Sequence, residues 1–196
     1  MRKNRIYLLL TGIIILGCGI QILFLFVFMN PHALEWSDPQ EYLSIANNLL
    51  AGKQFGSDIH DLIRSPGYPY FLTGILFLVG NNIMLIRLFH VFLYGFFLLG
   101  VFLLGNRWKG QSIGLIMTIL CAIYPYFIYI PLTLYPEALL IIITPWVLYF
   151  SLRFLQSGIS YVLIIICLLL ILGILTRPTY FIVSISCITY ILYQRN

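Results

Sequence analysis

The apolar run Gly67–Val79, GYPYFLTGILFLV, follows Pro66 and contains a second proline, Pro69. About 13 residues at about 1.5 Å each cover only about 20 Å as a helix. A membrane span needs about 20 residues to cross about 30 Å of hydrocarbon. We therefore predict a short re-entrant or interfacial helix over residues 67–79. Counting this run as a span would invert the orientation of every later segment.

The composition identifies a membrane protein. The chain has 196 residues, of which 61% are hydrophobic and 9% charged, and its mean hydropathy is +1.00. Too few polar residues are present to cover a soluble globule. The basic residues stand singly or at the ends of apolar runs, which excludes a nucleic-acid partner and is typical of membrane flanks. The four cysteines show no metal-binding or redox spacing.

Further apolar runs on both sides of residues 67–79 predict an all-α, polytopic transmembrane helix bundle with about six spans. The predicted spans are Ile6–Met29, Ile83–Leu104, Ile113–Ile130, Ala138–Leu155, Tyr161–Thr176 and the shorter Tyr180–Tyr193. No composition shift separates a second unit, so residues 1–196 are expected to form a single transmembrane domain.

The positive-inside rule selects the orientation of this bundle. If residues 67–79 do not cross, seven basic residues near span ends face the cytoplasm and every acidic residue faces outward. These basic residues are Arg2, Lys3, Arg5, Arg107, Lys109, Arg153 and Arg195. If the run crosses, the last four move outside and Glu137 moves inside. We therefore predict cytoplasmic termini, an external loop over residues 29–82, and a bacterial plasma membrane as the location.

The predicted external loop contains most of the acidic residues of the chain. Five of the six are Glu35, Asp38, Glu41, Asp58 and Asp61, and the sixth is Glu137. Within the loop, residues 38–52 predict an amphipathic helix lying on the outer membrane surface. Asp38 would be its N-cap, Glu41 would complete a capping box, and Gly52 would end it.

Several short motifs now point to one family. Asp38, Tyr42, Ala46, Leu49 and Gly52 follow the order D-x3-Y-x3-A-x2-L-x2-G. Further motifs are Arg64-Ser-Pro-Gly-Tyr-Pro, Arg87-Leu88, Tyr135-Pro136-Glu137 and Gly173-Ile-Leu-Thr-Arg177-Pro178. Together they resemble the GT-C class of integral membrane glycosyltransferases, nearest to glycosyltransferase family 39. That family and its bacterial relatives include the protein O-mannosyltransferases and the aminoarabinose transferases of lipid A.

The resemblance also contains two departures. Such enzymes usually have about twice as many spans, so the chain resembles their amino-terminal half and is expected to be truncated. Glu137 stands where the family commonly has aspartate, which is a chemically mild change.

The resemblance implies an enzyme that transfers a sugar, with inversion, from a lipid-linked polyprenyl-phosphate donor to a lipid, glycan or protein acceptor on the external face. Asp38 is the candidate general base or an electrostatic partner of the acceptor, and Glu137 would position the acceptor or a divalent metal. The candidate phosphate-binding residues are Arg64, Arg87 and Arg177, because guanidinium groups make bidentate contacts to phosphate. No cofactor is otherwise implied.

Each candidate also has a plainer interpretation. Asp38 could only cap its helix, which is worth about 1 kcal/mol, and Glu137 could be an acid favoured in a first helical turn. The arginines could extend to lipid head groups, although Arg87 lies about a turn inside its span. The alternative function is that of a catalytically inactive membrane protein, either truncated or a partner of a larger membrane subunit.

Overall fold

The computed structural model describes residues 2–56 and 63–195, so the predicted loop acids Asp58 and Asp61 lie outside the described residues. The elements in the described part of the chain are all helices, nine α-helices and one 3-10 helix. This confirms the all-α fold class.

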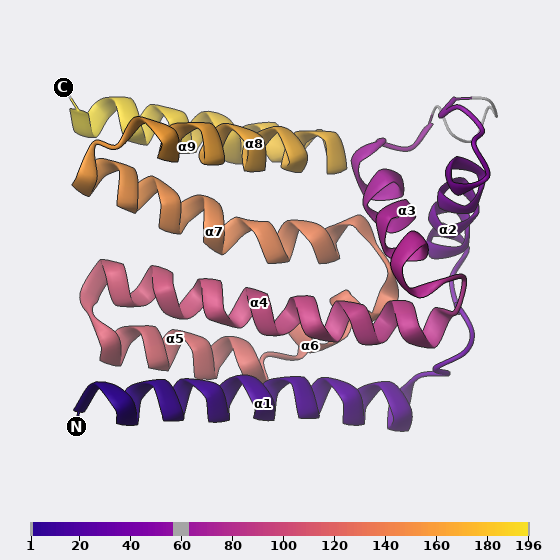
Figure 1. The fold of residues 1–196 in the computed structure, drawn as a ribbon, viewed down its shortest axis with the longest axis horizontal. Coiled ribbons are helices and arrows are strands. Elements are labelled where there is room, and N and C mark those ends of the chain that lie inside the picture. Colours follow the sequence, from indigo (N-terminus) through magenta and orange to yellow (C-terminus); the bar gives the residue numbers. More distant parts are fainter. Residues whose placement is uncertain (1, 57–62, 196) are drawn as a thin grey trace.

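One set of helices runs side by side, and two further helices stand across one end of this set (Figure 1). The aligned helices are α1 (Arg2–Phe28), α4 (Ile83–Lys109), α5 (Gln111–Ile123), α7 (Pro136–Ser157), α8 (Ser160–Thr176) and α9 (Tyr180–Arg195). The crossing pair is α2 (Ser37–Leu50) and α3 (Gly67–Val79). Both termini lie at the end of the bundle away from α2 and α3.

Three helices are long and apolar enough to cross a membrane, within α1, α4 and α7. A fourth span is reached if the bent pair formed by α5 and residues 125–133 counts as one. Helices α8 and α9, with 17 and 16 residues, cover only about 24–26 Å. By length, the described helices therefore give three or four spans rather than about six.

The third predicted span is broken at Tyr124, where the chain bends by 68° between α5 and the segment containing α6 (Pro125–Tyr129) and the 3-10 helix η2 (Ile130–Thr133). Tyr124 is extended (φ −73°, ψ 120°) because Pro125 follows it. Other helices satisfy backbone groups at the break. The Tyr94 hydroxyl lies 3.1 and 3.2 Å from the carbonyl oxygens of Cys121 and Ala122. Such partners are required where backbone lies at membrane depth.

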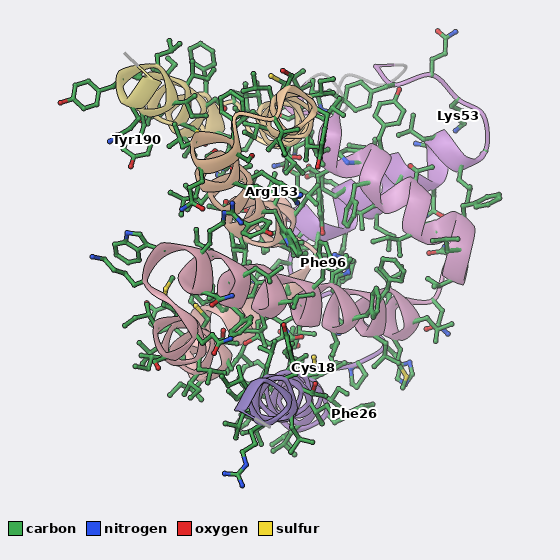
Figure 2. The ribbon with its side chains drawn as sticks, turned by 60° about the vertical axis from the view of Figure 1, so that its left-hand side comes forward. Cys18, Phe26, Lys53, Phe96, Arg153 and Tyr190 are labelled. Carbon is green, nitrogen blue, oxygen red and sulfur yellow. The ribbon has the colours of Figure 1, made fainter. Side chains whose placement is uncertain are left out.

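The outer faces of the bundle are apolar, as a lipid-facing surface requires. Phe26 projects outward from α1 (Figure 2), and many other large apolar side chains of α1, α8 and α9 are exposed. On α3 the side chains of Tyr70, Phe77 and Leu78 are exposed as well.

The apolar face of α2 packs on α3. Tyr42 and Ala46 are buried, the Tyr42 and Tyr68 rings meet edge to face at 5.4 Å, and Thr73 Oγ1 donates to the Ala46 carbonyl at 3.3 Å. The predicted amphipathic face thus contacts another helix of the chain. Gly52, with φ +82°, follows the end of α2, as its sequence predicts.

Candidate functional site

A polar pocket of about 280 Å³ lies where the α2–α3 end meets the bundle. Four of the five predicted site residues line it: Asp38 from α2, Arg64 from the segment before α3, Glu137 from the start of α7, and Arg177 directly after α8. These residues come from four separate segments, so the fold, and not their spacing, brings them together.

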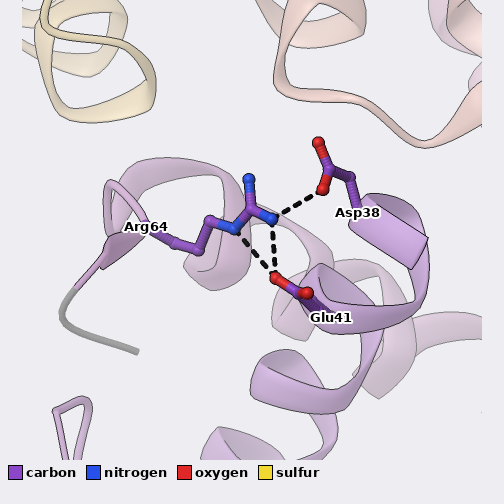
Figure 3. A network of polar contacts seen from close by, with 3 residues as sticks. All are labelled: Asp38, Glu41 and Arg64. Atoms are coloured by element: carbon purple, nitrogen blue, oxygen red, sulfur yellow. Dashed lines mark hydrogen bonds and ion pairs between the residues drawn. The ribbon is translucent and has the colours of Figure 1, made fainter. Parts of the chain in front are cut away.

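Arg64 is held by two carboxylates of α2 (Figure 3). Its Nη2 donates to Asp38 Oδ1 at 2.7 Å and to Glu41 Oε2 at 2.6 Å, and its Nε also donates to Glu41 Oε2 at 3.1 Å. The hydrogen bonds to Asp38, and then to Glu41, raise the pKa of Arg64 above its ordinary value. The guanidinium group therefore stays charged.

The capping prediction for α2 is wrong. The helix begins at Ser37 after Trp36, with no side-chain cap hydrogen bond, and Asp38 lies in its first turn. The carboxylates of Asp38 and Glu41 instead turn to Arg64, since a full charge is a stronger partner than a backbone N–H. An acid in the first turn still gains from the helix dipole.

The ring of Tyr42 packs against the Arg64 guanidinium group. The Arg64 Cζ lies 5.1 Å from the centre of the Tyr42 ring, a cation–π distance. Burial raises the pKa of the Tyr42 phenol, so its hydroxyl stays protonated at neutral pH. Sequence reasoning did not assign Glu41 and Tyr42 to the site. Their signal is the spacing of Asp38, Glu41 and Tyr42, three and four residues apart on one helix face.

Glu137 and Arg177, which also line the pocket, form a second ion pair. Pro136 is the first residue of α7 and fixes Glu137 in its first turn. Arg177 is extended (φ −153°, ψ 121°) after the last turn of α8, and its N–H donates to the Gly173 carbonyl at 2.9 Å. The second carboxylate oxygen of Glu137, Oε2, is buried and has no hydrogen-bond partner among the described residues.

A close contact between α3 and α8 brings the ion pairs of Arg64 and the Glu137–Arg177 ion pair to one pocket. At Gly67, a Cβ atom would lie 2.6 Å from the Leu175 carbonyl carbon and 2.7 Å from the Thr176 nitrogen. Only glycine allows the start of α3 to approach the α8 backbone so closely. Arg64 precedes this contact and Arg177 follows it.

Arg87 lies apart from this pocket. It is fully buried, and its Nε donates to the Leu132 carbonyl at 3.0 Å while Nη1 donates to the Asn30 carbonyl. Of the three arginines predicted to bind phosphate, Arg64 and Arg177 line this pocket and Arg87 does not.

The described residues do not fit a metal centre. In residues 2–56 and 63–195 no group of three or more histidine, cysteine, aspartate or glutamate side chains converges on a common point. Asp38, Glu41 and Glu137 instead contact arginines.

Comparison with known protein families matches residues 64–196 to dolichyl-phosphate-mannose-protein mannosyltransferases. The matched region begins at Arg64 and includes Glu137 and Arg177, whereas Asp38 and Glu41 precede it. No curated protein and no solved structure matched the chain. The matched region covers more than half of the residues and confirms the resemblance drawn from the motifs. The chain belongs to the dolichyl-phosphate-mannose-protein mannosyltransferase family.

Proposed function

We propose that the protein transfers a sugar from a polyprenyl-phosphate donor to an acceptor at the external membrane face, with inversion at the anomeric carbon. One observation carries this proposal: Asp38, Arg64, Glu137 and Arg177 line a single pocket. The pocket thus combines carboxylates that can accept a proton with guanidinium groups that can bind a phosphate. Both are needed for sugar transfer from a phosphate leaving group.

The arrangement in the membrane is also a proposal. Helices α1, α4, α5 with α6, α7, α8 and α9 make six passes, α2 and α3 lie at the external surface, and α3 is re-entrant. Both termini lie at the bundle end opposite α2 and α3 (Figure 1), which supports a common cytoplasmic side for them. Arg107 and Lys109 lie in the last turn of α4, whereas α3 lies near the start of that helix. The positive-inside rule favours a cytoplasmic position for these two basic residues.

In the proposed reaction the acceptor hydroxyl attacks the anomeric carbon. The new bond forms between the acceptor oxygen and this carbon, and the bond from the carbon to the phosphate oxygen breaks with its electron pair. The acceptor proton passes to the Asp38 carboxylate. The polyprenyl phosphate leaves with the negative charge, which the arginines stabilise. Glu137 orients the acceptor and holds Arg177.

The contacts of Arg64 suggest how Asp38 becomes available. Glu41 accepts two hydrogen bonds from Arg64, whereas Asp38 accepts one. The two carboxylate side chains are exposed to a similar degree, 44% for Asp38 and 41% for Glu41, so the number of hydrogen bonds distinguishes them. A donor phosphate can therefore replace Asp38 at Nη2 while Glu41 keeps the guanidinium group in place. Asp38 is then free to accept the proton.

The direct test is sugar transfer by membranes that contain the protein. Labelled polyprenyl-phosphate mannose and polyprenyl-phosphate aminoarabinose serve as donors, with release of the sugar as the measurement. We expect Arg64→Met to raise the donor KM by at least about 10-fold, because a charge-assisted hydrogen bond is worth about 1.5–3 kcal/mol. Lys53→Met is the matched control, since this exposed cation of the same loop does not line the pocket. An unchanged donor KM in Arg64→Met would remove Arg64 from phosphate binding.

The proposed topology gives a separate prediction. In a background without native cysteines, a cysteine at Lys53 should react with an impermeant maleimide added to intact cells, and a cysteine at Lys109 should not. Lys53 lies at the α2–α3 end of the molecule (Figure 2), whereas Lys109 ends α4. The opposite labelling pattern would place the pocket on the cytoplasmic side.

A further inference from the structure

Arg87 is buried and contacts no carboxylate among the residues that the structure describes, which is an unusual position for a charge in a membrane protein. Its exposed fraction is 0%, and it lies in the second turn of α4. Both of its hydrogen bonds go to backbone carbonyls from other parts of the chain, at Asn30 and Leu132. The guanidinium group therefore connects α4 to two segments distant in sequence.

Asn30 belongs to the turn that leads from α1 to α2. Its side chain accepts a hydrogen bond from the His32 N–H at 3.1 Å, and its own N–H donates to Glu35 Oε1 at 3.4 Å. These contacts make a compact turn, and Arg87 binds its carbonyl. The turn is followed by Trp36 and then by Asp38 in the first turn of α2.

Leu132 belongs to η2, which leads to the start of α7. The chain then passes through Leu134, whose φ of +58° is left-handed. Such a conformation costs a non-glycine residue about 1–2 kcal/mol, so surrounding contacts must hold it. Leu132 and Leu134 are fully buried, and Glu137 follows directly after Pro136.

We infer that Arg87 is a positioning residue, which binds the Asn30 and Leu132 carbonyls together and thereby fixes how far Asp38 lies from Glu137. The planar guanidinium group suits this task, because its nitrogens donate in fixed directions to two acceptors at once. A lysine keeps the charge but not this geometry. The consequence for catalysis rests on the proposed function, whereas the consequence for the backbone does not.

The backbone test uses thiol protection in a background without Cys18, Cys121, Cys167 and Cys187. A cysteine placed at Leu132, where exposure is 0%, should be protected from an impermeant maleimide. Arg87→Gln and Arg87→Lys should each raise its labelling rate by at least about 10-fold, since local opening then no longer breaks two hydrogen bonds. Arg107→Gln, at the other end of the same helix, is the matched control and should leave the rate unchanged.

Two outcomes would overturn the inference at this level. One is continued protection of the Leu132 cysteine in Arg87→Gln. The other is equal deprotection of a cysteine at Ala46, a buried position in the α2–α3 contact, because Arg87 would then support the whole fold rather than these two segments.

The kinetic test separates positioning from phosphate binding. In membranes active for sugar transfer, Arg87→Gln should lower kcat by at least about 10-fold with the donor KM unchanged, because misplaced groups affect the transition state. A raised donor KM with unchanged kcat would instead make Arg87 a phosphate ligand and overturn the inference. If no membranes transfer sugar, the proposed function fails, and the thiol test still decides the role of Arg87.

Discussion

Replacing Asp38 with asparagine is expected to lower the rate of sugar transfer by about 100- to 10,000-fold, the range for loss of a general base. Asparagine keeps the size of the side chain and can still lie beside Arg64, but it cannot take the acceptor proton. The measurement is release of labelled sugar from the polyprenyl-phosphate donor. Protein content and insertion in the membrane should stay unchanged.

Glu41→Gln is the matched control for this variant. Glu41 lies one turn further along α2 and contacts the same arginine, so the change also removes one carboxylate from the Arg64 cluster. It should weaken donor binding, raising KM, and leave kcat within a few fold. Full activity of Asp38→Asn would remove Asp38 from the mechanism.

Gly67→Ala is expected to lower transfer by about 10- to 100-fold, because misplacement by about 1 Å can cost about 100-fold. The new methyl group would meet the backbone of Leu175 and Thr176, which cannot move aside as a flexible side chain can. The start of α3 must then move away from the end of α8. Arg64 and Arg177, on the two sides of this contact, would separate.

Gly74→Ala is the control, on the same helix. A Cβ atom at Gly74 would meet nothing within 4 Å among the described residues. Alanine should there favour the helix by up to about 1 kcal/mol and leave the transfer rate unchanged. Equal loss of activity in both variants would show that the effect comes from α3 itself and not from its contact with α8.

Much of the fold could be predicted from hydropathy and length. The apolar run at residues 67–79 is helical with the same bounds as α3, and the apolar runs after it correspond to α4, α5, α7, α8 and α9. The break at Tyr124 was missed, since Ile113–Ile130 is apolar throughout. Pro125 within that run was the available signal. Hydropathy reports burial in lipid, but it does not report whether a helix is straight.

The candidate site was predictable as a set of residues but not as a set of contacts. Four residues predicted from the sequence line one pocket: Asp38, Arg64, Glu137 and Arg177. The sequence could not distinguish Asp38 as a helix cap from Asp38 as a partner of Arg64, since both choices satisfy the carboxylate. Arg87 was grouped with the phosphate-binding residues because its charge is visible in the sequence. The carbonyls at Asn30 and Leu132 that surround it are properties of the tertiary structure.

The break between α5 and α6 has a consequence for biosynthesis. The hydroxyl of Tyr94 in α4 shares its one proton between the carbonyls of Cys121 and Ala122, and Gln21 of α1 donates to the Ile128 carbonyl at 3.0 Å. Alone in lipid, this segment would expose unpaired backbone groups, each costing several kcal/mol. Membrane insertion of the third predicted span, Ile113–Ile130, is therefore expected to depend on α1 and α4, which precede it during synthesis. We expect the segment that contains the break to leave the translocon only together with α1 and α4, the two helices that complete its hydrogen bonds.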